Sequence, residues 1–172
     1  MHAGTPELDA ALERLSTAMH AYLAMQVDAG AQVVQLFDSW AGILPRHLLE
    51  TRSFSAARTT LTALSAPTIY FAPGAGHALG SMRSVGATAY GVDWRMPIDE
   101  AWAKLGTDVA IQGGLDPAIL LTDPEHIQAA VADLLRRTAG RQGHIVNLGH
   151  GIDRHTPIEN VAAFVDAIKE AH

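Results

Sequence analysis

The sequence of 172 residues contains no cysteine. Disulfides, thiolate nucleophiles and cysteine-based zinc or iron–sulfur sites are therefore excluded, and the lack of thiols suits a reducing cytoplasm. Basic residues are also few, because 12 Lys+Arg stand against 18 Asp+Glu, which gives a formal net charge of −6. This balance disfavours a nucleic acid or an anionic membrane surface as a partner.

Long apolar runs are absent too. No stretch reaches the roughly 18 apolar residues that a membrane span needs, and Met1 is not followed by the pattern of a signal peptide. We therefore expect a soluble cytoplasmic protein without an export signal. Hydrophobic residues make up 48% of the chain, which is enough for the core of a single domain over residues 1–172.

Five short apolar strands alternate with helical segments along the sequence. The strands are expected at residues 31–37, 67–72, 87–92, 108–112 and 144–148. The helices are expected at residues 6–28, in part of 45–64, and at 77–85, 97–105, 124–138 and 157–168. Thr156 to Glu159 matches a capping box that would open the last helix. The alternation predicts an α/β fold with a parallel sheet covered by helices.

A polar or glycine-rich cluster follows every expected strand. The clusters lie at residues 38–40, 73–74, 93–95, 113–117 and 149–151. Ligands of parallel α/β proteins bind at the carboxyl ends of the strands, in open sheets and in closed barrels alike, so we expect the site there. The alternative is structural: Asp38, Asp93 and Asp116 would cap helices or shape turns, and Trp40 and Trp94 would pack in the interior.

The last cluster is the most informative one, because a strand of the buried type at 144–148 runs directly into Gly149-His150-Gly151. Glycines on both sides of His150 would permit backbone angles that other residues avoid and would let a ligand approach the main chain. His150 is therefore a candidate site residue at a strand end. A simple strand-to-helix turn is the alternative.

Several other chemistries find little support. The glycines at 74–76 lack the last glycine of a dinucleotide fingerprint, and the chain has no phosphate-binding P-loop sequence. Ser39 does not lie in a Gly-x-Ser-x-Gly elbow, so a hydrolase triad with His150 has no basis. The nine histidines include no His-Glu-x-x-His pair, which disfavours a metal site.

Four blocks of the sequence resemble the uroporphyrinogen decarboxylase family in order and spacing. They are Val34-Gln-Leu-Phe-Asp-Ser-Trp-Ala-Gly42, Gly91-Val-Asp-Trp94, Gln112-Gly-Gly-Leu-Asp-Pro117 and Asn147-Leu-Gly-His-Gly151. The resemblance covers nearly the whole chain but only about the C-terminal half of that family's (β/α)8 barrel. It implies a partial TIM barrel of about five strand-helix units.

The resemblance also implies a function: decarboxylation of the four acetate side chains of uroporphyrinogen III to coproporphyrinogen III in haem biosynthesis, without a metal or organic cofactor. Ser39 and His150 match the family's substrate-contacting serine and histidine. A hydroxyl and an imidazole can donate hydrogen bonds to substrate carboxylates. The family's arginine-rich motif, its aspartate and its tyrosine correspond to positions before Met1, so no catalytic residue is assigned here.

Some features depart from the family pattern. Gly114 stands where the family usually has an asparagine, which removes a side chain that could hold the loop. Arg46, Arg95 and Arg154 follow strand ends and could supply positive charge, although solvated surface positions explain at least two of them better. The chain could therefore be inactive alone. The alternative function is a noncatalytic tetrapyrrole-binding or assembly protein; a corrinoid-linked methyltransferase is disfavoured by the lack of cysteine.

Half of a barrel leaves its first and last strands with unpaired edges. We therefore expect a homodimer, pairing with an N-terminal half, or partial disorder of the chain alone. A full-length parent truncated at Met1 would explain the sequence equally well.

Overall fold

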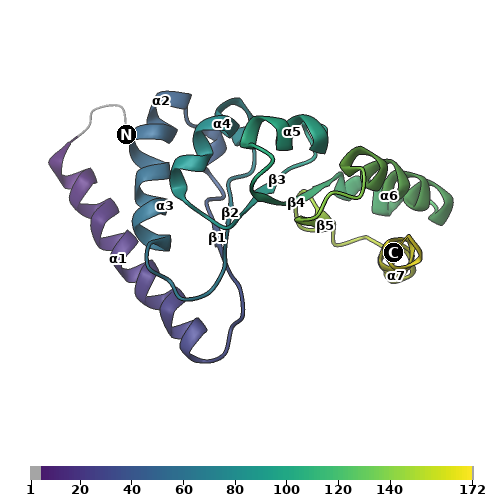
Figure 1. Cartoon of the computed structure of the whole chain (residues 1–172), viewed down its shortest axis with the longest axis horizontal. Coiled ribbons are helices and arrows are strands. Elements are labelled where there is room, and N and C mark those ends of the chain that lie inside the picture. Colours follow the sequence, from purple (N-terminus) through teal and green to yellow (C-terminus); the bar gives the residue numbers. More distant parts are fainter. Residues whose placement is uncertain (1–4, 172) are drawn as a thin grey trace. The chain divides into compact units, whose positions relative to one another are not determined.

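A computed structural model describes residues 5–171 and confirms the α/β class (Figure 1). The strands are β1 Val34–Phe37, β2 Thr68–Phe71, β3 Ala89–Val92, β4 Ala110–Leu115 and β5 His144–Leu148. Their order in the sheet is the order of the chain, β1-β2-β3-β4-β5. Sequential order is typical of a segment of a β/α barrel, since a doubly wound sheet reverses direction at a switch point.

Helices separate the strands as the sequence predicted. They are α1 Pro6–Asp28, α2 Arg46–Leu48, α3 Phe54–Leu61, α4 Leu79–Met82, α5 Ile98–Leu105, α6 Pro124–Thr138 and α7 Ile158–Glu170. Short tight segments join them: η1 Ala41–Ile43, η3 Ala75–Ala78, η4 Arg83–Val85, η5 Pro117–Leu121, and the π-helical η2 Leu49–Ser53. Among residues 5–171, no helix is long and apolar enough to cross a membrane.

The chain divides into two compact units, Met1–Tyr90 and Gly91–His172, with the boundary inside β3. The single domain expected from the sequence stays a prediction. In the first unit, β1 and β2 pair in parallel, with Val34 opposite Thr68 and Phe37 opposite Phe71. Strand β2 is buried along its whole length, and α1 packs against α3 (Figure 1).

In the second unit, β4 and β5 pair in parallel from Ile111 opposite His144 to Leu115 opposite Leu148. Helix α6 packs against α7 (Figure 1). Trp102 of α5 is buried, and its indole N–H donates to the carbonyl oxygen of Val109 at 2.9 Å. These contacts bring the ends of β4 and β5 to the same edge of the sheet within this unit.

Two details of the expected strands are wrong. Strand β5 alternates between half-buried and exposed residues and is not of the buried type, because it is the last strand of the sheet. Strand β4 runs on through its two glycines to Leu115 and does not end at Gln112. The glycines allow this, since Gly113 and Gly114 have φ values of +106° and +96°.

The expected capping box is also wrong. Helix α7 begins at Ile158, with Pro157 in the N-cap position and no side-chain cap. The hydroxyl of Thr156 is buried and has no hydrogen-bond partner among the residues that the structure describes. Because the helix starts one residue later than expected, Thr156 lies outside the position from which a side chain caps the first turn.

Candidate functional site

Ser39 lies in the turn that directly follows β1, and its side chain is exposed. The backbone N–H of Asp38 donates to the carbonyl oxygen of Phe71 at 2.8 Å, so the pairing of β1 with β2 continues up to the residue before Ser39. The structure therefore places Ser39 at the carboxyl end of a strand. This is the edge at which parallel α/β proteins bind their ligands.

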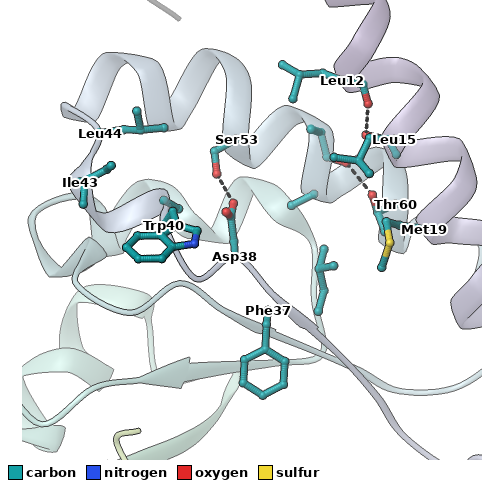
Figure 2. Close-up of a pocket in the computed structure, with 15 residues that line it drawn as sticks. Leu12, Leu15, Met19, Phe37, Asp38, Trp40, Ile43, Leu44, Ser53 and Thr60 are labelled. Carbon is teal, nitrogen blue, oxygen red and sulfur yellow. Dashed lines mark hydrogen bonds between the residues drawn. The ribbon is translucent and has the colours of Figure 1, made fainter.

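The carboxylate of Asp38 is held by two hydroxyl groups in the interior of the first unit. The Ser53 hydroxyl donates to Asp38 Oδ2 at 2.5 Å (Figure 2), and the Tyr70 hydroxyl donates to the same atom at 3.0 Å. Burial, together with the neighbouring carboxylate, raises the pKa of Tyr70 well above its ordinary value. Tyr70 therefore stays a proton donor, and Asp38 anchors the start of the Ser39 turn.

Sequence reasoning missed Ser53 and Tyr70. Tyr70 lies in an apolar strand that reads as core, and Ser53 lies in the π-helical segment η2, where no motif marks it. The structural alternative for Asp38, that it caps a helix or shapes a turn, is correct only in giving this residue a structural role. Its side chain accepts hydrogen bonds from distant elements and does not cap a helix.

We expect Asp38→Ala to lower the free energy of unfolding by about 2–3 kcal/mol, because it leaves two buried hydroxyls without their acceptor. Tyr70→Phe removes one hydrogen bond and should cost about 1 kcal/mol. Urea unfolding measures both values. Tyr22→Phe is the control, since Tyr22 is 53% exposed and should change nothing measurable. Equal stabilities of all three variants would contradict the anchoring role of Asp38.

An apolar pocket of about 450 Å³ opens beside this network (Figure 2). Residues of α1, of η1, of α3 and of the turn after β1 line it. Its rim carries large exposed side chains: Trp40 and Ile43 are each 78% exposed, and Phe37 is 61% exposed. The alternative that Trp40 packs in the interior is wrong, because the turn leaves its indole uncovered. Exposed apolar groups that lie together are typical of a surface that another segment covers.

His150 lies in the loop that follows β5 and is exposed. Its ring lies edge to face with Trp94, at 6.3 Å between ring centroids. The preceding Gly149 is buried, and its N–H donates to the carbonyl oxygen of Leu115 at 2.7 Å. The second unit thus places His150 at the carboxyl ends of its strands, as the sequence predicted.

One of the two expected reasons for the glycines beside His150, unusual backbone angles, is wrong; close approach of a ligand to the main chain stays a prediction. Neither Gly149 nor Gly151 has a positive φ. Gly149 is needed for space instead, since a Cβ there would lie 2.5 Å from the backbone nitrogen of Trp94. A Cβ at Gly151 would meet nothing within 4 Å. Close packing of two loops, and not an unusual backbone angle, explains the first glycine.

Asp93 shapes the turn in which Trp94 lies. Its carboxylate accepts from the backbone N–H of Arg95 at 2.9 Å and from Nη1 of the same residue at 2.9 Å. Asp116 accepts from the backbone N–H of Ala118 at 2.9 Å and caps the short helix η5. The structural alternative is therefore confirmed for both aspartates.

The other departures from the family pattern have structural explanations. A Cβ at Gly114 would lie 3.0 Å from Ile98 Cδ1 and 3.2 Å from Leu134 Cδ1, so position 114 faces helices α5 and α6. A Cβ at this position would therefore lie on the side of the strand that the helices cover. Arg46 is exposed and donates to Glu50 at 2.7 Å, and Arg154 donates to His155 at 3.3 Å. Both contacts are those of surface residues.

Sequential parallel strands that carry polar clusters at their carboxyl ends define a β/α-barrel type of protein with a ligand site at that end. The particular family follows from comparison with known proteins. The family model described as Uroporphyrinogen decarboxylase (URO-D) matches residues 1–171. The chain belongs to the uroporphyrinogen decarboxylase family, which confirms the resemblance carried by the four sequence blocks.

Curated relatives agree. Uroporphyrinogen decarboxylases of Chloroflexus aggregans and Coxiella burnetii are 43% and 44% identical to the chain over 165 and 167 residues. The alignments cover 92% of this chain but 46% of each relative. The chain therefore spans about half the length of the curated relatives that it matches.

A solved structure supports the fold alone. A methyltransferase from Methanosarcina mazei is similar, with a TM-score of 0.82 and 22% sequence identity. The similarity covers 91% of this chain and 47% of that one. Here too, the match extends over about half of the larger protein, as expected for a partial barrel.

Proposed function

We propose that this chain supplies the C-terminal half of a uroporphyrinogen decarboxylase barrel. The reaction converts the four acetate side chains of uroporphyrinogen III to the methyl groups of coproporphyrinogen III. In each step one carbon–carbon bond breaks, CO₂ leaves, and a proton adds to the remaining carbon. The observation that carries the proposal is the family match over residues 1–171.

In this proposal Ser39 and His150 bind and orient substrate. Both side chains are exposed at strand ends, where a hydroxyl and an imidazole can donate hydrogen bonds to carboxylates. Asp38 holds the turn of Ser39, and Trp94 lies against the ring of His150. No residue of this chain is proposed to break the carbon–carbon bond, and no cofactor is invoked.

The charge of the chain supports the need for a second half. Uroporphyrinogen carries eight carboxylates, and binding it requires a basic pocket. The chain has a net charge of −6 and 12 Lys+Arg. We propose that an N-terminal half, on the same polypeptide or on a separate one, adds the missing basic groups and covers the apolar pocket beside Trp40. A homodimer and a cytoplasmic location stay predictions.

The test is anaerobic incubation with uroporphyrinogen III, with carboxyl loss measured by mass spectrometry. We expect substrate binding and turnover only after addition of the N-terminal half of the Chloroflexus aggregans relative, because that half adds the missing basic groups. His150→Ala should lower turnover of the mixture by at least tenfold. His126→Ala is the control, because His126 is an exposed residue of α6 that contacts Asp123 at 2.8 Å.

Each other outcome has a distinct meaning. Binding without turnover in the mixture would favour a noncatalytic tetrapyrrole-binding protein. Absence of both binding and turnover in the mixture would contradict the proposed function. Light scattering of the chain alone, without the N-terminal half, distinguishes a homodimer from a monomer.

A further inference from the structure

We propose that Arg95 is a further carboxylate-binding residue of the same site, held beside His150 by the indole of Trp94. The inference rests on the proposed function and deepens it, since it assigns a cationic group to the recognition of a polycarboxylate. The residues involved all belong to the second unit.

The guanidinium of Arg95 is fixed from two sides. Its Nη1 donates to Asp93 Oδ2 at 2.9 Å, and its central carbon lies 4.3 Å from the centroid of the Trp94 ring. The side chain of Asp93 is only 10% exposed, so the anchoring carboxylate is itself held in place. A planar guanidinium stacked on an indole and paired at one edge has lost most of its freedom before a ligand arrives. Preorganisation of this kind lowers the entropic cost of binding.

The same guanidinium keeps most of its hydrogen-bonding capacity. An arginine side chain has five N–H donors, and one of them is donated to Asp93 among residues 5–171. The Arg95 side chain is 58% exposed, so a ligand can reach the remaining donors. A guanidinium edge matches the geometry of a carboxylate, to which it can donate two parallel hydrogen bonds.

Trp94 connects Arg95 to the residue that the family match assigns to the substrate. The cation lies over the face of the indole, and the His150 ring lies edge to face with the same indole at 6.3 Å between centroids. The loops of Trp94 and His150 can lie this close because Gly149 has no side chain: a Cβ there would clash with the backbone of Trp94. Two donors of hydrogen bonds to anions therefore share one aromatic support. In this proposal, a ligand with several carboxylates around one macrocycle engages both groups.

Arg141 offers a matched control within the same unit. Its guanidinium also lies over an indole, at 4.8 Å from the ring centroid of Trp102. It precedes β5, however, and so belongs to the amino end of that strand, whereas His150 follows the carboxyl end. Arg95→Ala and Arg141→Ala remove the same charge and the same type of stacking, at opposite ends of the sheet.

The experiment measures the dissociation constant of uroporphyrinogen III under anaerobic conditions for the chain mixed with the N-terminal half of its relative. We expect Arg95→Ala to weaken binding by about tenfold. Arg95→Lys should recover part of the affinity, because it keeps the charge but loses the planar edge. Arg141→Ala should bind as the unchanged chain does. The affinity of Arg95→Ala should also depend less on salt concentration.

Unfolding in urea separates binding from folding: Arg95→Ala should unfold cooperatively, at a midpoint lowered only by the loss of one partner of Asp93, which keeps the backbone N–H of residue 95. Unaltered affinity of Arg95→Ala, or an equal loss in Arg141→Ala, would overturn the inference. If His150→Ala weakens binding and Arg95→Ala does not, the proposed function stands and only this inference fails. If the unchanged chain does not bind in the mixture, both fail together.

Discussion

Gly149→Ala is expected to lower the free energy of unfolding by about 3 kcal/mol, near the upper end of the cost of overpacking a filled site. The added Cβ would lie 2.5 Å from the backbone nitrogen of Trp94 and 2.9 Å from the Cα of Asp93. Both neighbours are backbone atoms, so a side-chain rotation cannot relieve the clash. The loop of Trp94 must move, and with it the contact between Trp94 and His150. We therefore expect uroporphyrinogen binding to weaken together with stability, as measured by urea unfolding and equilibrium binding.

Gly151→Ala is the matched control, because Gly151 flanks the same histidine on its other side. A Cβ there would meet nothing within 4 Å, and the φ of Gly151 is not positive. Its stability should stay within about 0.5 kcal/mol of the unchanged chain. Equal effects of the two substitutions would show that the two loops do not pack as closely as the structure places them.

Gly42→Ala is expected to destabilise the first unit by about 3 kcal/mol for a similar reason. The added Cβ would lie 2.2 Å from the carbonyl oxygen of Pro73 and 2.7 Å from Gly74. Gly42 belongs to η1, just after the turn of Ser39, so the clash would displace the loop that presents this residue. We expect a lower midpoint of thermal unfolding and, in the mixture of the two halves, weaker binding of uroporphyrinogen.

Gly30→Ala separates crowding from backbone strain. Gly30 has a φ of +107°, but a Cβ there would meet nothing within 4 Å. Its substitution should cost about 1–2 kcal/mol through strain alone and should leave binding unchanged. A larger loss of stability in Gly30→Ala than in Gly42→Ala would refute the close contact between η1 and the loop after β2.

Local features of the sequence were sufficient for much of the fold. The expected helix at 124–138 coincides with α6, because Asp123, a proline at the first position and apolar periodicity all mark it within the segment itself. The segments 45–64 and 77–85 were harder to predict, since they break into short α, 3₁₀ and π pieces. Their irregularity follows from packing around the strand ends, which no local pattern reports.

The candidate site was predictable in part. Ser39 and His150 follow strands in recognisable blocks, so their positions at strand ends were expected and are observed. The residues that hold Asp38, and with it the turn of Ser39, were not predictable. Ser53 and Tyr70 meet Asp38 through contacts between different elements, and nothing in their own neighbourhoods marks them.

The sequence by itself determined the α/β class, the alternation of strands and helices, and the family, because periodicity, turn residues and motif spacing are properties of short segments. Only the tertiary structure decided which side chains meet. It showed that Gly149 makes room for Trp94, that position 114 faces the helices, and that Arg95 and His150 share one indole. Each of these depends on distances between segments that are far apart in the chain, and such distances are set by the packing of the whole unit.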